Sequence, residues 1–379
     1  MVSKGVLKKP RIDAIEYMRG ISMLGVIGIH VGSQYIINTN ANIHLIAVFE
    51  ILTRFSVPIF FFISAFGLFY NLDTSAGFNY RQFMKKRFKT VFVPYLFWSF
   101  LYISIYALRY HDLSMFNPLH IVYVLFLGLA CYQLYFMVIL IWFYLLMPLW
   151  IYMVKRSTGI RLCLLLIIQI AIDYYSSFMM NPYGIANPLV RDLLVYRLNY
   201  WVIHYVFIFI LGGYLAVHFE DFKLFMKNRR IWISAFFVLS LGGLLIYYYY
   251  CVFGVGYTAL EAINTAHQLS PAGIIYTIGA SVFLFSEFYN RKWPEFLRKT
   301  FSLLGRHSYF AYLCHPVFIS IFAAIMVRLN LLMTAVNSMV FYVAVVCCSV
   351  ISAAFCRWFS KKYCPYINSL TIGVYAKHK

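Results

Sequence analysis

Residues 11–31 read RIDAIEYMRGISMLGVIGIHV, and this stretch decides the fold. It is apolar enough to enter a bilayer, although it contains Glu16, Arg19 and His30. A charged side chain inside a membrane helix costs at least a few kcal/mol, so it is normally kept for a purpose. At about 100° and 1.5 Å per residue, Arg19 and His30 fall within about 20° of one face and about 16 Å apart along the axis. We therefore predict one membrane helix that points a fixed cation and a titratable imidazole into the protein interior at two depths.

The composition excludes a soluble globular protein, because 63% of the 379 residues are hydrophobic and only 12% are charged. A net charge of +20 would indicate nucleic-acid binding in a soluble protein. Here the basic residues occupy short loops between apolar runs, so we expect them to set topology and to attract anionic membrane lipids. No nucleic-acid partner is expected. The eight cysteines show no metal-binding spacing, so we interpret them as small hydrophobic residues and expect no metal.

Apolar runs of the length that a bilayer requires recur along the whole chain. The predicted spans are roughly 12–33, 45–70, 91–108, 133–153, 162–180, 199–217, 232–250, 272–289, 307–327 and 336–358. Most Lys and Arg residues fall on alternate loops, as the positive-inside rule requires if both termini are cytoplasmic. The sequence thus predicts an all-α polytopic membrane protein with about ten transmembrane helices. One membrane domain, 1–358, precedes a basic cytoplasmic tail, 359–379, and segment 117–130 is expected to be a half-membrane or interfacial helix.

The polar residues of the first two spans are the first candidates for chemistry. His30 is a natural general base for a hydroxyl group, and Arg19 offers a fork that suits phosphate or carboxylate. In the second span, Glu50 and Arg54 are four residues apart and should face the bundle interior. Glu50 could hold the tautomer of His30 while Arg54 stabilises an oxyanion. Purely structural alternatives remain: Glu16 could neutralise Arg19, His30 could be an interfacial residue, and Glu50 with Arg54 could form a buried ion pair.

A second intramembrane histidine occurs late in the chain. Residues 305–318 read GRHSYFAYLCHPVF, which puts His315 well inside the ninth predicted span. Pro316 frees a backbone carbonyl at this depth. His315 is therefore a candidate substrate or cofactor ligand. His204, in the outer half of the sixth span, is a further candidate for lining the site, and Gly212 and Gly213 are expected to permit close helix packing.

These motifs resemble the acyltransferase-3 family of integral membrane enzymes. The specific landmarks are Arg19-x10-His30, with an acidic residue three positions before the arginine, and the late Leu-x-His-Pro that contains His315. VPIFFFISAFGLFY (57–70) resembles a further family element, in which Ser64 is a lining candidate and Ala65 replaces the usual glycine. YQLYFMVILIWFYLLMP (132–148) resembles the aromatic start of the family's fourth span, where Gln133 and Tyr135 would line the outer cavity.

MKKRFKTVFVPYLFW (84–98) is similar to the family's basic helix start, although Thr90 stands where a second arginine is common. The resemblance implies transfer of an acyl group, most often acetyl, from cytoplasmic acyl-CoA to a hydroxyl of an extracytoplasmic glycan or envelope polymer. It also implies a multi-pass protein of the bacterial cytoplasmic membrane, with acetyl-CoA or another acyl-CoA as donor substrate. The resemblance and the chemistry of the individual side chains together suggest a role for each candidate residue. The catalytic candidates are His30, Arg19 and Glu50; the substrate-binding candidates are Arg54, His315, Tyr135, Gln133 and Ser64; the donor-binding candidates are Glu16, Lys86, Arg87 and Lys89.

The alternative from another class is a transporter or flippase for an envelope sugar or polysaccharide precursor. Ten helices with intramembrane Arg, Glu and His suit that function too. Transporters, however, commonly have inverted repeats with broken helices in matching halves, and the two halves of this chain do not correspond. The sequence leaves open the acyl group, the acceptor, an acyl-enzyme intermediate, partner proteins and the oligomeric state.

Overall fold

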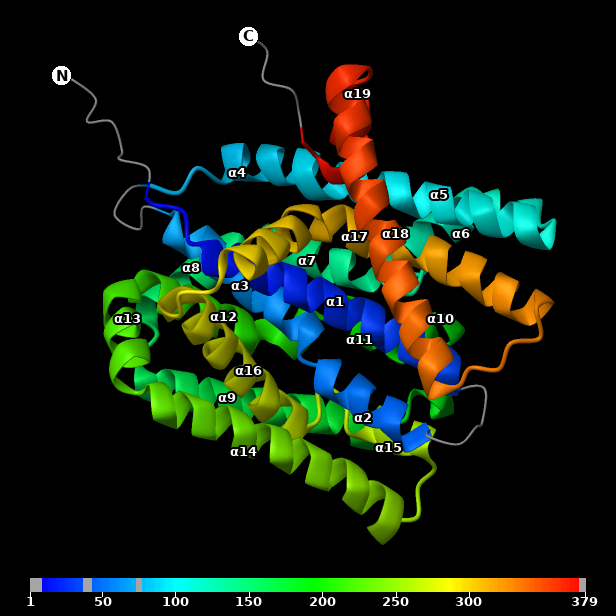
Figure 1. Cartoon of the computed structure of the whole chain (residues 1–379). Helices are drawn as coiled ribbons and strands as arrows, with labels where there is room; N and C mark the ends of the chain where they lie inside the picture. Colours follow the sequence, from blue (N-terminus) through cyan, green and yellow to red (C-terminus); the bar gives the residue numbers. More distant parts are fainter. Residues whose placement is uncertain (1–8, 37–42, 73–76, 375–379) are drawn as a thin grey trace.

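The computed structural model describes residues 9–36, 43–72 and 77–374 and is built from helices, with no strand in those ranges (Figure 1). The predicted all-α membrane architecture is confirmed. The N-terminal part contains α1 (Asp13–Ile36), α2 (Ile43–Thr53), α3 (Ser56–Tyr70), α4 (Tyr80–Arg87), α5 (Val93–Tyr110), α6 (Pro118–Leu127), α7 (Tyr135–Leu145), α8 (Met147–Arg156) and α9 (Gly159–Tyr174). The C-terminal part contains α10 (Pro188–Val195), α11 (Arg197–Tyr200), α12 (Val206–Val217), α13 (Phe219–Asn228), α14 (Arg230–Tyr249), α15 (Ala259–Thr265), α16 (Pro271–Asn290), α17 (Glu295–Arg328), α18 (Ala335–Lys362) and α19 (Tyr366–Ile372).

Each of the ten predicted spans overlaps a helix of the described chain. Seven continuous helical segments are long and apolar enough to cross a membrane, and two bent pairs raise the number to nine. The bends are 70° between α7 and α8 and 95° between the helical segment 202–217 and α13. The remaining predicted span is α1, whose 24 residues reach about 36 Å. Because α1 contains charged and polar residues, it is less apolar than these nine segments and is not among them. The number of crossings and the side on which the termini lie stay predictions.

Helix α1 lies in the middle of the bundle, with α5 on one side and α9 and α14 on the other (Figure 1). Small residues let its neighbours approach. A Cβ on Gly20 would lie 2.9 Å from the backbone nitrogen of Gly305 on α17, and a Cβ on Gly25 would collide with the hydroxyl of Ser56 on α3. Close backbone contact of this kind is how membrane helices associate without a hydrophobic driving force. The helix with the candidate residues is therefore held from several sides.

The helix ends follow from local sequence. The side chain of Ser270 accepts a hydrogen bond from the backbone N–H of Gly273 (3.1 Å) at the start of α16, and Thr334 caps α18 in the same way. Gly128 adopts φ 71° immediately after α6, a conformation that favours glycine. The ten-residue α6 is too short to cross a bilayer by itself, as expected for the 117–130 segment.

The C-terminal segment packs on the bundle. The indole N–H of Trp98 on α5 donates to the carbonyl oxygen of Thr371 at the end of α19 (3.0 Å). Gly373 has φ 64° and lies against the backbone of Thr90. Thr90, the position where the family commonly has a second arginine, is thus covered by the C-terminal segment in this chain.

Gly212 permits the close packing of α12 on α3 that the sequence predicts, because a Cβ there would collide with the carbonyl oxygen of Phe62. We expect Gly212→Ala to lower the stability of the solubilised protein by about 1–3 kcal/mol, the usual cost of overpacking. The matched control is Gly242→Ala on α14, where a Cβ meets nothing within 4 Å. Thermal unfolding in detergent measures both. Equal transition temperatures for the two variants would show that the α3–α12 contact does not limit stability.

Candidate active site

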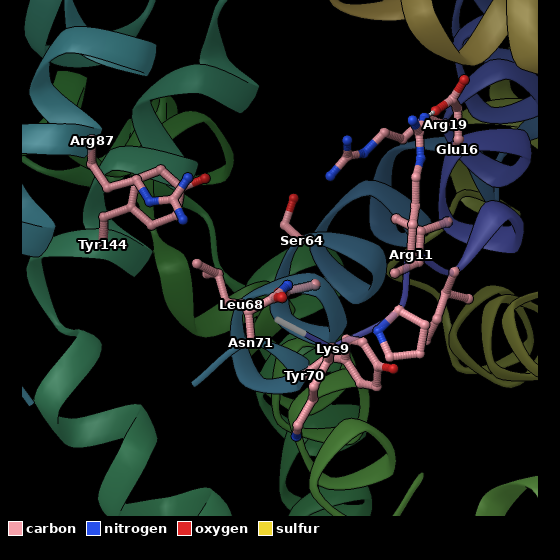
Figure 2. Close-up of a pocket in the computed structure, with 14 residues that line it drawn as sticks. Lys9, Arg11, Glu16, Arg19, Ser64, Leu68, Tyr70, Asn71, Arg87 and Tyr144 are labelled. Carbon is pink, nitrogen blue, oxygen red and sulfur yellow. Dashed lines mark hydrogen bonds and ion pairs between the residues drawn. The ribbon is translucent and has the colours of Figure 1, made fainter. Parts of the chain in front are cut away.

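A basic cavity of about 490 Å³ opens between α1, α3, α4 and α7 at the end of the bundle where α1 begins (Figure 2). Its lining residues are Lys9, Pro10, Arg11, Ile12, Ile15, Glu16, Arg19, Ser64, Gly67, Leu68, Tyr70, Asn71, Arg87 and Tyr144. Four of them carry a positive charge and one carries a negative charge. The volume lies in the range of small-molecule and cofactor sites, and the charge suits an anionic ligand. We name it the Arg19 cavity.

Glu16 and Arg19 do not neutralise each other, although they are one helical turn apart. The carboxylate of Glu16 forms an ion pair with Arg11 and accepts a hydrogen bond from the hydroxyl of Ser302 (2.8 Å). Within the described part of the chain, no carboxylate forms an ion pair with Arg19. The Arg19 guanidinium extends into the open centre of the cavity, toward Ser64 (Figure 2). It is available for a ligand.

Arg87 approaches the cavity from the opposite wall (Figure 2). Its guanidinium lies over the rings of Phe83 and Tyr144, with centroid distances of 5.1 Å and 4.9 Å. Stacking of this kind orients a guanidinium and leaves its N–H groups free for phosphate. Lys86 and Lys89, the other two basic donor-binding candidates, are exposed and do not line the cavity.

A second cavity, of about 210 Å³, brings together candidates from three parts of the sequence. His30, Arg54, Gln133 and Tyr135 all line it, as does Tyr312. We name it the His30 cavity. The Nε2 of Gln133 donates to the carbonyl oxygen of Leu313 (3.4 Å), and its side-chain oxygen is buried without a hydrogen-bond partner among the described residues. The cavity therefore presents an imidazole, a guanidinium and an unsatisfied amide oxygen.

The two intramembrane histidines meet. The rings of His30 and His315 stack with a centroid distance of 5.3 Å, and Tyr132 contacts His30 at 4.4 Å. The Nδ1 of His315 donates to the carbonyl oxygen of Tyr312 (2.6 Å). Its Nε2 is buried and has no partner within the described chain, so this tautomer leaves a free lone pair. Tyr132 and Tyr312 lie in the quoted stretches 132–148 and 305–318, but neither was chosen as a site candidate because tyrosine is abundant along the whole sequence.

Glu50 contacts Arg54 and not His30. Its Oε1 accepts from the guanidinium of Arg54 at 2.5 Å, and its other oxygen is buried without a partner in the described structure. A Cβ on Gly32 of α1 would lie 3.2 Å from that oxygen. Glu50 is thus in a position to orient Arg54, whose Nε is also unpartnered. The contact that would let Glu50 set the tautomer of His30 is absent from the described side-chain contacts.

The two cavities both border α1, α3 and α7, and on α1 and α3 their lining residues are separated by one to two helical turns. On α3, Ser64 lines the Arg19 cavity and Phe60 lines the His30 cavity. These residues are one turn apart, about 6 Å. On α1, the nearest lining residues are Arg19 and Val26, about 10 Å apart. The Phe60 ring packs on Phe136 with a centroid distance of 5.6 Å.

His204 belongs to a separate buried network. Its Nδ1 donates to Asp173 (2.6 Å) and its Nε2 lies 3.5 Å from the hydroxyl of Ser176. Arg197 donates through Nε to that hydroxyl (3.0 Å), and Gln169 donates to the second oxygen of Asp173 (2.9 Å). His204 and Gln169 border a cavity of only about 20 Å³. His204 does not line the His30 cavity. This network fixes the start of α12 against α9.

Asp173→Ala should destabilise the protein by about 3–5 kcal/mol, because it removes a charged hydrogen-bond partner from the buried side chains of His204 and Gln169. Asp192→Ala is the control, since the Asp192 side chain is 44% exposed and its ion pair with Arg191 is long, at 3.8 Å. Exposed pairs contribute about 0–1 kcal/mol. Unfolding of the solubilised variants by heat compares them. A stable Asp173→Ala protein would mean that the network does not support the fold.

The family model described as an acyltransferase domain, that of the acyltransferase-3 family, matches residues 12–358, and the chain belongs to this family. No curated protein and no solved structure matches the chain. Together with its helical bundle, the match defines a multi-pass membrane acyltransferase. The resemblance stated from the sequence is confirmed over nearly the whole chain.

Proposed function

We propose that this protein transfers an acyl group, most often acetyl, from cytoplasmic acyl-CoA to a hydroxyl of an extracytoplasmic glycan or envelope polymer. One observation carries the proposal: two cavities lie at different depths along α1, one basic and one lined by histidine and arginine. An anionic donor and a neutral hydroxyl acceptor need those two environments. The cytoplasmic membrane of a bacterium is the proposed location.

The donor would bind in the Arg19 cavity. Its diphosphate would meet the guanidinium groups of Arg19 and Arg87, which project from facing walls (Figure 2). Arginine forks suit phosphate because two parallel N–H groups match two oxygens. The pantetheine arm would then extend along α1 toward His30, about 16 Å away along the axis. This step requires that the Phe60 ring, which packs on Phe136, moves aside to let the pantetheine arm pass.

In the His30 cavity, the imidazole of His30 would take the proton of the acceptor hydroxyl as its oxygen attacks the thioester carbonyl carbon. The C–O bond forms, the C–S bond breaks, and the thiolate of CoA leaves with the proton that His30 holds. The products are the ester and free CoA, so the imidazole is regenerated without any further reactant. His315, stacked on His30 with a free Nε2, is proposed to accept a hydrogen bond from the acceptor substrate.

The tetrahedral intermediate carries a negative oxygen, which needs a donor already in place. Arg54 lines the His30 cavity, is oriented by Glu50, and has an unpartnered Nε within the described structure. We assign the oxyanion to Arg54, with Glu50 as its positioning residue. Gln133 and Tyr135 would contact the acceptor.

The test is transfer of label from acetyl-CoA by the purified protein in nanodiscs, with and without envelope glycans. We expect wild type to consume acetyl-CoA and to label the glycan. If wild type neither binds nor consumes any acyl-CoA supplied, the donor assignment is wrong. Transport of an envelope sugar or precursor would then become the leading function.

A further inference from the structure

A second basic cavity, of about 650 Å³, lies on the other side of the α1 N-terminus from the Arg19 cavity. It is formed by the start of α1, the end of α16 and the start of α17. We name it the Arg298 cavity. Arg11 and Ile12 line both cavities, so the two are neighbours that share a wall. A ligand longer than either cavity can pass over that wall from one to the other.

The charge of the Arg298 cavity is mainly positive. Its charged lining residues are Arg11, Arg291, Lys292 and Arg298 against Asp13 and Glu295. Glu295 is engaged by Lys299 (2.7 Å), a residue outside the cavity. Arg298 and Lys292 are exposed and have no ion-pair partner within the described ranges. Two cations are therefore available to an anionic group.

The cavity is also lined by two flat side chains that contact each other, Trp293 and Arg291. Trp293 packs against Phe301 and Phe288, with centroid distances of 5.6 Å and 5.9 Å, and its indole N–H donates to the carbonyl oxygen of Glu287 (3.2 Å). The guanidinium of Arg291 lies 4.6 Å from the Trp293 ring centroid. Nucleobases bind by stacking on aromatic rings and on guanidinium planes. A fixed indole beside free cations suits a nucleotide.

We propose that the Arg298 cavity binds the 3′-phosphoadenosine end of the acyl-CoA donor, with the base against Trp293 and Arg291 and the 3′-phosphate at Arg298 and Lys292. This assignment rests on the proposed function and completes it: with the diphosphate at Arg19 and Arg87, the ribose end of the donor would pass over the shared wall at Arg11 into the Arg298 cavity. An anionic lipid headgroup would use the cations but has no base to stack. The joint presence of cations, an aromatic surface and continuity with the Arg19 cavity favours the nucleotide.

The test compares acetyl-CoA with 3′-dephospho-acetyl-CoA as donors for the protein in nanodiscs. For wild type, we expect removal of the 3′-phosphate to raise KM about tenfold or more, as for the loss of a charged hydrogen bond. Arg298→Gln should raise KM for acetyl-CoA toward the same value and change KM for the dephospho donor little. Arg306→Gln, about two helical turns further along α17 and outside the cavity, is the matched control and should behave as wild type.

Three results would overturn the assignment. Wild type could use both donors equally well, or Arg298→Gln could keep the full discrimination between them. An effect of Arg298→Gln that is equal for both donors and appears only in nanodiscs with anionic lipid would assign the cavity to a lipid headgroup. Failure of the proposed function differs from all three, since neither donor would then be bound or consumed, and the nucleotide assignment would fall with it.

Discussion

Replacing His30 by alanine should lower the rate of acyl transfer by about two to four orders of magnitude, the usual contribution of a general base. The imidazole is the group in the His30 cavity that can take a proton from a hydroxyl near neutral pH. Arg54 in the same cavity offers only hydrogen-bond donors and so does not compete for that proton. Loss of the base should reduce kcat and leave KM for the donor nearly unchanged, because the donor phosphates bind at the other end of α1.

The experiment measures label transfer from acetyl-CoA by wild type, His30→Ala and His120→Ala in nanodiscs. His120 is exposed on α6 and lines neither cavity, so its variant should match wild type. The His30→Ala protein should also fold. Its thermal unfolding checks this, because unfolding reports packing independently of chemistry. A folded His30→Ala protein with wild-type kcat would remove His30 from the mechanism.

Arg19→Gln should raise KM for acetyl-CoA by about tenfold to a hundredfold and change kcat less. Charged hydrogen bonds contribute about 1.5–3 kcal/mol each, and that loss falls on donor binding. The Arg19 guanidinium faces the cavity centre without an ion pair in the described structure, so its removal leaves no orphaned carboxylate. Arg19→Lys should give an intermediate KM, because an ammonium keeps the charge and loses the fork.

Lys86→Gln is the control for net charge. Lys86 belongs to the same basic surface as Arg87 but does not line the cavity, so its KM should change less than threefold, as for screened surface charges. Steady-state kinetics over a range of acetyl-CoA concentrations compares the three variants. If Arg19→Gln and Lys86→Gln raise KM equally, the cavity acts by general attraction and not through a bound phosphate.

The features that could be predicted from the sequence are those that depend on a single helix. Arg19 and His30 could be put on the same face of α1 because eleven residues of regular helix determine their angle and separation. The spans could be found because apolar length is a local property. Both inferences need no knowledge of which helices are neighbours.

Contacts between distant segments could not be predicted. Spacing suggested that Glu16 pairs with Arg19, yet the carboxylate instead pairs with Arg11 and accepts a hydrogen bond from Ser302. Ser302 lies on α17, which crosses α1 where Gly305 lets the backbones meet. The pairing of Asp173 with His204 joins α9 to the residues just before α12, across a loop without any motif. The stacking of His30 on His315 likewise depends on how α1 and α17 cross. Such pairs are set by tertiary packing, which leaves no periodic signal in a single sequence.

The proposed mechanism is tested most directly by measuring from which side of the membrane the donor is taken. Sealed inside-out and right-side-out vesicles would be prepared from cells that make the protein, with His30→Ala vesicles as background, and given labelled acetyl-CoA outside. We expect label transfer in inside-out vesicles, and transfer in right-side-out vesicles only after permeabilisation. Equal transfer by intact vesicles of both orientations would contradict the proposed mechanism.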